Sequence, residues 1–232
     1  MLDKPLAEGP APETRDWAAL LAPYRTPDTA RSLLEIVVTA LPFAGFWTLA
    51  YLSLSVHWLL TGFFVVCASF FLVRLFLIQH DCGHHSFFVN REANDWVGRV
   101  IGVLTLTPYQ VWRHSHAKHH ATSGNLDRRG FGDIDTLTVR EYRAMSRWER
   151  IAYRIYRFPP VIFGIGPAFI FMVKQRLPFG FMRAGAKFWL SAMGTNLSIV
   201  AVMGVMMWLV GWKAFLMVHL PICLLTGSIG VW

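Results

Sequence analysis

Charged residues and cysteines are both scarce in this sequence. Charged side chains make up 16% of the 232 residues, and residues 36–73 carry none, whereas soluble domains average about 25%. The low charge argues against a soluble globular domain. The three cysteines, Cys67, Cys82 and Cys223, predict no disulfide framework. No basic segment followed by a short apolar core lies near the N-terminus, so no cleavable signal peptide is predicted.

Apolar residues instead make up 54% of the sequence, and the mean hydropathy is +0.41. They fall in uncharged runs near the length, about 20 residues, that a helix needs to cross a bilayer. Four spans in two hairpins are predicted, at residues 33–54, 57–79, 188–212 and 214–232. We therefore expect an all-α integral membrane protein. Residues 1–30 are predicted to be a cytoplasmic N-terminal arm, helical near residues 17–24, and residues 31–232 the membrane domain.

Three further stretches are apolar or amphipathic but do not make a regular span. Residues 96–112 contain Arg99 and Pro108 and are predicted to form an interfacial helix. Residues 136–157 interleave arginines with aromatic residues, which favours a basic amphipathic helix lying on anionic headgroups. Residues 158–173 are uncharged but contain three prolines, so we expect a re-entrant or interfacial segment.

The net charge of +8 is concentrated in the loops. Residues 80–157 carry twelve Lys/Arg against eight Asp/Glu, and residues 158–187 carry four basic residues and no acid. The connections on the opposite side carry only Lys213. Because Lys and Arg are enriched in cytoplasmic loops, we place the histidine-rich region on the cytoplasmic side and expect no nucleic-acid partner. Arg74, near that end of the second span, is expected to reach lipid headgroups.

Seven of the nine histidines lie in two clusters between residues 79 and 135. In the first cluster, His80 and His84 are four residues apart, so they share one face of a helix and can bind one metal ion. His85 points elsewhere on a regular helix unless Gly83 loosens the turn. Cys82 is interpreted as a small residue in a tight turn rather than a thiolate ligand.

The second cluster offers up to three convergent imidazoles. His116 and His119 are three residues apart, and His120 follows His116 by four, whereas His114 points away on a helix. Together the clusters supply five or six imidazoles, more than one tetrahedral zinc site needs. Imidazole also suits iron, and a redox metal beside the membrane can oxidise unactivated hydrocarbon. The spacing therefore predicts a metal site, with iron favoured.

The two clusters also carry a family resemblance. The sequence HDCGHH at residues 80–85, followed by HAKHHATSGNLD at residues 116–127, resembles the first two histidine boxes of the membrane fatty acid desaturases. The closest resemblance is to the bacterial form of the acyl-lipid delta-12/omega-6 branch. It implies a non-haem diiron centre that uses O2 to introduce a cis double bond into a membrane-lipid acyl chain. Electrons would come from a carrier such as ferredoxin or cytochrome b5, and the location would be the bacterial inner membrane.

The resemblance also assigns roles to residues. The implied iron ligands are His80, His84, His85, His116, His119 and His120. Asp81, Asn125 and Asp127 are candidates to orient these ligands by hydrogen bonds, with ordinary turn and capping roles as the alternative. The candidates for an acyl channel are Phe70, Phe71, Phe76, Phe87 and Trp112.

The sequence departs from the family pattern after the fourth span. The family has a third H-x-x-H-H box, and the only later histidine here is His219, inside that span. We therefore expect an incomplete membrane domain that is inactive alone. Two alternatives remain open: a carotenoid ketolase or hydroxylase with the same diiron chemistry, and a non-catalytic metal-binding membrane fragment.

Overall fold

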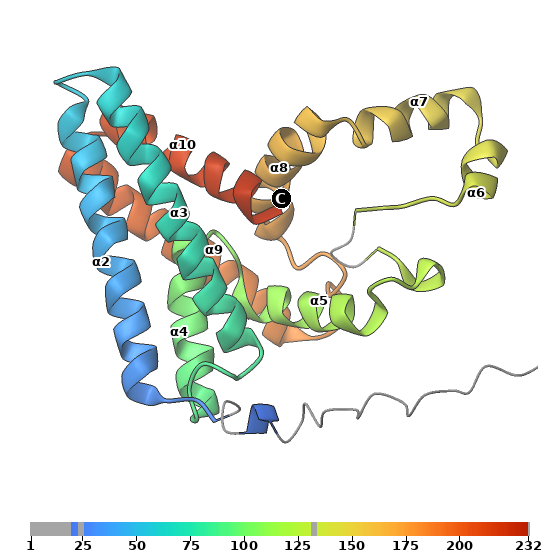
Figure 1. Ribbon diagram of the computed structural model, residues 1–232, viewed down its shortest axis with the longest axis horizontal. Helices are drawn as coiled ribbons and strands as arrows, with labels where there is room; N and C mark the ends of the chain where they lie inside the picture. The colour runs from blue at the N-terminus through green and yellow to red at the C-terminus, as the bar shows by residue number, and fades with distance from the viewer. Residues whose placement is uncertain (1–19, 23–25, 131–133, 232) are drawn as a thin grey trace, which may run out of the picture.

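The computed structural model describes residues 20–22, 26–130 and 134–231, and within them the chain is helical, with no strand (Figure 1). Its four longest helices are each apolar and long enough to cross a membrane. They are α2 (Thr29–Ser53), α3 (Trp58–Gly83), α9 (Ala186–Val210) and α10 (Trp212–Val231). The predicted all-α membrane fold with four spans is therefore confirmed. Of the predicted helix at residues 17–24, residues 20–22 are helical and the others lie outside the described residues.

Helices α2 and α3 form an antiparallel hairpin with a short turn. His57 begins α3 as its N-cap, and its Nδ1 atom accepts a hydrogen bond from the Leu59 amide at 3.2 Å. The hydroxyls of Ser53 and Thr61 lie 3.0 Å apart across the turn. The two spans are joined by four residues, and the N-cap satisfies backbone N–H groups where the second helix begins. His57 therefore has a boundary role and lies outside the histidine clusters.

Helix α3 lies at the centre of the molecule, between α2, α4 and α10 (Figure 1). Ala68 and Leu72 of α3 and Val218 and Ile222 of α10 are almost fully buried in one apolar cluster. Small and branched side chains allow helices to pack closely, and close packing is a main source of helix association in a membrane. This packing holds α3 in a fixed position, which matters because the first histidine cluster lies at the C-terminal end of this helix.

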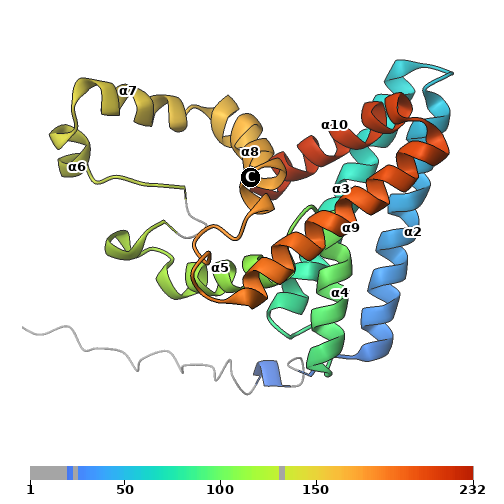
Figure 2. The same cartoon turned by 180° about the vertical axis from the view of Figure 1, so that it is seen from behind.

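The prediction of one continuous helix at residues 96–112 is wrong. The chain instead forms two helices, α4 (Arg91–Leu104) and α5 (Tyr109–Thr122), which a turn separates. Leu106 has a φ of +58° in this turn, and Pro108 follows as the N-cap of α5. A left-handed residue followed by proline ends a helix. Helix α4 packs against α3 and α9, and α5 lies beside the N-terminal end of α9 (Figure 2).

The predicted single helix at residues 136–157 is also wrong, because the stretch forms α6 (Val139–Ala144) and α7 (Arg147–Tyr156). Ser146 starts the second helix with a capping box, in which its hydroxyl accepts from the Glu149 amide. The amphipathic character is retained in α7, where Trp148 and Ile155 are exposed on one face and arginines lie on the other. The expected irregular segment follows as η3 (Val161–Ile165), α8 (Gly166–Met172) and η4 (Lys174–Arg176), bent by 60° from α7.

Arg74 differs from its predicted role. Its guanidinium forms an ion pair with Glu35 of α2 rather than reaching away to headgroups. The α2–α3 hairpin places the two side chains side by side, and an opposite charge at the same depth is a better partner than a distant phosphate. The pairing could not be read from sequence because it depends on the rotation of α2 against α3.

Candidate metal centre

The first two imidazoles of the site come from the end of α3. The helix continues through His80 to Gly83, and His84 is its C-cap, with its amide bonded to the His80 carbonyl at 3.1 Å. Because the α-helical geometry persists to this point, the predicted four-residue spacing places both rings on one side of α3. Their ring centroids are 4.6 Å apart.

The other two imidazoles come from α5. His116 and His120 are one turn apart on its face toward α3, and their Nε2 atoms are 2.9 Å apart. The start of α5 is tied to α9, because the Gln110 amide donates to the Ser191 hydroxyl at 3.2 Å. Trp112, one turn before His116, stacks on its ring at 4.7 Å with an interplanar angle of 12°. This stacking holds the ring toward α3.

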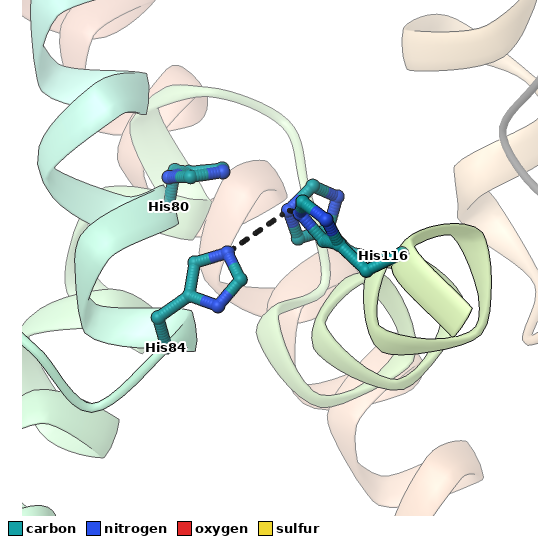
Figure 3. A group of neighbouring side chains, drawn as sticks. His80, His84 and His116 are labelled. Carbon is teal, nitrogen blue, oxygen red and sulfur yellow. Dashed lines mark hydrogen bonds between the residues drawn. The ribbon is translucent and has the colours of Figure 1, made fainter. Parts of the chain in front are cut away.

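Four imidazoles therefore converge between the two helices. One nitrogen from each of His80, His84, His116 and His120 lies within 4.8 Å of all the others. His84 Nε2 is 3.2 Å from His116 Nε2, and Figure 3 shows the His84 and His116 rings pointing toward each other from opposite helices, with His80 above. A metal bound to imidazole nitrogens at about 2.1 Å separates opposite ligands by about twice that distance. The nitrogen separations in the cluster, from 2.9 Å to at most 4.8 Å, bracket that distance, so the four residues fit a metal ion.

The electrostatics of the cluster favour neutral rings. Burial and the neighbouring imidazoles lower the pKa of His116 to about 4. Burial, then His80 and His120, also lower the pKa of His84. An imidazole must be unprotonated to bind a metal, so burial and the neighbouring rings keep His84 and His116 in the ligating form at neutral pH.

Two of the predicted ligands are not brought into this cluster. His85 turns away from it, with a φ of +56° and its Nε2 atom 3.1 Å from Asp95 Oδ1. His119 lies on α5 with its ring centroid 6.0 Å from that of His116. His114 points away from the cluster, as predicted: it bonds the Gln110 carbonyl at 2.8 Å and lies against Phe188 of α9. His219 stacks on Phe215 within α10.

The three candidate orienting residues occupy different surroundings. Asp81 Oδ1 is 3.1 Å from His80 Nδ1, which leaves Nε2 of that ring to face the cluster. Asn125 instead accepts from the Asp127 amide at 2.9 Å and caps the short helix η2 (Leu126–Arg128). The structure thus gives Asn125 a capping contact and Asp81 a contact with a clustered imidazole.

Sequence reasoning missed a polar group beside the first cluster. Asp95 of α4 and Tyr109 and Arg113 of α5 surround His85. One signal was available in the sequence. Asp95 lies three residues before Gly98, about one helical turn away, and Gly98 is on the packed face of the amphipathic helix α4. A carboxylate in that position suggests a polar partner on a neighbouring helix. Tyr109 is fully buried, and burial of a hydroxyl predicts a hydrogen-bond partner.

The fold and the site together define a class, an integral membrane protein with a histidine cluster able to hold a metal ion. Residues 56–232 match the family model described as fatty acid desaturase, and the chain therefore belongs to the fatty acid desaturase family. The resemblance drawn from the two histidine boxes is confirmed at the level of the family.

Individual relatives agree with this assignment. The chain is 48% identical over 214 residues to a fatty acid desaturase of Bacillus subtilis (strain 168), covering 91% of this chain and 60% of that protein. It is 32% identical over 176 residues to an sn-1 acyl-lipid omega-3 desaturase (ferredoxin) of Synechocystis, covering 68% and 47%. An oleoyl-12-hydroxylase of Ricinus communis is 39% identical over 80 residues, covering 34% and 19%. The chain thus spans 60% or less of the length of these relatives. No solved structure matches the chain significantly.

Proposed function

We propose that this chain provides the iron-binding membrane region of an oxygen-dependent desaturase that introduces a cis double bond into the acyl chain of a membrane lipid. The observation that carries the proposal is the convergence of four imidazoles, two at the end of a membrane span and two on the helix beside it, in a chain of the desaturase family. A methylene hydrogen is too weakly acidic for removal by a side-chain base. The protein's part is to position the lipid and the metal.

The proposed ligands of the first metal are the four clustered residues, His80, His84, His116 and His120. The family resemblance predicts two iron ions, and the second needs further ligands. His119 is a candidate because its ring lies beside both His116 and His120. When bound, iron with O2 supplies the oxidising power that removes hydrogens from an unactivated methylene pair.

A row of neighbouring aromatic side chains, which we call the aromatic wall, extends from the imidazoles toward the membrane interior. The ring of Trp112 lies 5.9 Å from His80 and 5.5 Å from Phe76, and Phe76 lies 6.3 Å from Phe171 of α8. Phe76 and Phe171 line a narrow apolar cavity between α3, α8 and α10, together with Gly227. We propose that the acyl chain passes along this wall to reach the metal.

The other predicted channel residues face elsewhere. Phe71 packs against Phe46 of α2 at 5.6 Å, and Phe87 packs against Phe88. Phe70 is exposed on the outside of α3. Of the five aromatic candidates, Phe76 and Trp112 therefore remain the proposed lining of the channel.

We propose that the electron donor is a small acidic carrier such as ferredoxin or cytochrome b5. The name of the Synechocystis relative includes ferredoxin, and arginines of α6 and α7 offer a positive surface that would steer an acidic partner. The excess of Lys and Arg on the histidine side supports placing the centre on the cytoplasmic side of a bacterial inner membrane.

Lipid analysis of a bacterial host that expresses this protein tests the proposal. We expect purified protein to retain iron, and the host acyl chains to gain a double bond. His84→Ala should abolish both results, whereas His57→Asn, which keeps an N-cap far from the centre, should change neither. Iron-loaded protein that leaves acyl chains unaltered but converts an added carotenoid would support the ketolase or hydroxylase instead. Protein that binds iron and converts neither substrate would support the non-catalytic alternative.

A further inference from the structure

His85 lies next to the proposed metal centre, but its ring turns away from the four converging imidazoles and belongs to a separate polar cluster. Asp95 Oδ1 is 3.1 Å from its Nε2 atom. The Nη2 atom of Arg113 lies 3.4 Å from its Nδ1 atom. Nε2 therefore donates to the carboxylate, and the single lone pair of the neutral ring, on Nδ1, faces a guanidinium. A ring in this position has no free lone pair with which to bind a metal.

The backbone of His85 is strained as well. Its φ of +56° lies in the left-handed region, which is sterically unfavourable for a residue with a Cβ atom. Such a conformation persists where surrounding contacts over-determine it. Here the contacts are those of the side chain, together with the bond from the His85 amide to the Cys82 carbonyl at 3.0 Å.

The same cluster joins three helices. The hydroxyl of Tyr109 lies 2.8 Å from the Cys82 carbonyl of α3 and 3.0 Å from Asp95 Oδ1 of α4, and can donate its hydrogen to either. Its ring fits against Gly98, where a Cβ atom would lie 2.2 Å from the ring. Arg113 Nε donates to the Gly83 carbonyl at 2.9 Å. These contacts set the end of α3, which carries His84, against the start of α5.

We infer that Asp95, Tyr109, Arg113 and His85 form a brace that positions His84 against His116, and that His85 acts through Asp95 as a positioning residue rather than as a metal ligand. The inference rests on the proposed metal site. Hydrogen bonds from His85 and Tyr109 outweigh the effect of burial and hold the pKa of Asp95 below its usual value, so the central acceptor stays charged. Contacts that orient ligands usually change metal affinity about 10–100-fold when removed.

Binding of Co²⁺ to the purified full chain tests the brace, with affinity, stoichiometry and the visible absorption bands as readouts. His85→Ala and Asp95→Ala should each weaken binding about 10–100-fold but keep the wild-type stoichiometry and band positions, because the ligands are unchanged. The double variant should lose less affinity than the sum of the two single losses, because the contact between His85 and Asp95 is common to both. His84→Ala should abolish the bands.

Two control variants separate positioning from general stability. Asp135→Ala removes an exposed carboxylate outside the brace and should leave Co²⁺ affinity unchanged. Ile222→Ala, which empties a fully buried position in α10, should lower the melting temperature without changing the absorption bands. If His85→Ala abolishes the bands as His84→Ala does, His85 is a ligand and the inference is overturned. Additive losses in the double variant would overturn it too.

Hydrogen exchange of the metal-free protein provides a readout that does not depend on a metal. Asp95→Ala should speed exchange of the His85 and Ser86 amides, which bond to the Cys82 and Asp81 carbonyls. The control variant Asp135→Ala should not. Unchanged exchange in Asp95→Ala would overturn the brace. Wild-type protein that binds no Co²⁺ but shows the expected exchange would overturn the proposed metal centre and retain the brace.

Discussion

The junction of α3, α4 and α5 and the arm formed by α6 and α7 are both polar, but they are held together in different ways. In the junction, bonds join residues far apart in sequence, such as Tyr109 to Cys82 and Arg113 to Gly83. In the arm, the capping bonds link residues three apart, as between Thr138 and Glu141. Local bonds determine where helices begin. Bonds between distant residues determine how helices sit together, and the histidine cluster depends on that second kind.

The largest expected effect comes from removing a ligand at the junction. His116→Ala deletes the imidazole that lies within 3.2 Å of both His84 and His120. Removing an orienting contact usually weakens metal binding about 10–100-fold, and removing a ligand should cost more. We therefore expect metal affinity to fall by more than about 100-fold. Metal analysis of purified protein measures the effect. The matched variant His114→Ala removes a ring of the same helix directed toward α9, and retained metal in His116→Ala would contradict the proposed site.

A smaller effect should follow from disturbing the packing of the junction. Gly98→Ala places a Cβ atom 2.2 Å from the Tyr109 ring, and overpacking of this kind destabilises by about 1–3 kcal/mol. Thermal unfolding in detergent measures the loss. Gly194→Ala is the control, because nothing lies within 4 Å of its added Cβ and alanine favours a helix. Equal melting temperatures for the two variants would show that Tyr109 is not packed as described.

The proposed acyl path can be narrowed without touching the junction. In Gly227→Leu the added side chain begins 3.2 Å from Phe171 and 3.4 Å from Pro167, so it should fill the cavity beside Phe76. We expect about tenfold less desaturated product at unchanged iron content, a loss of about 1.4 kcal/mol in transition-state stabilisation. Gly204→Leu, in open space on α9, is the control. Full activity in Gly227→Leu would place the substrate elsewhere.

The smallest effect should come from the arm. Bonds from the Thr138 amide and hydroxyl, with Arg129 beside them, lower the pKa of Glu141 to about 2, from about 4.3 in an unfolded chain. A depressed folded-state pKa gives stability that is fully present above about pH 4.3 and lost as the pH falls through about 2. The protection of the α6 amides against hydrogen exchange, taken relative to the intrinsic exchange rate at each pH, should therefore fall between these values. Glu141→Gln should remove this dependence. Metal affinity measured at neutral pH should not change in this variant, and a change would show that the arm helps to hold the centre.

Much of the fold was predictable because its causes are local. A hydrocarbon layer demands long uncharged runs with internally satisfied backbones, so composition alone placed the four spans close to where the structure has them. The errors fell where short helices end. Within residues 96–112, Leu106 adopts a left-handed conformation that its residue type does not predict. Ser146 was not recognised as a helix start, although Glu149 follows it three residues later, as in a capping box.

The sequence by itself determined that histidines at helical spacing lie at the end of a membrane span, since the period of the helix places His80 beside His84 and His116 beside His120. Tertiary structure decided which rings meet. His84 and not His85 faces the cluster because His84, the C-cap of α3, keeps helical backbone angles, whereas His85 turns away and Asp95 holds its ring. The partner of Arg74 and the contact of Tyr109 with Gly98 likewise depend on how helices rotate and cross, which is set by packing between residues that no local pattern connects.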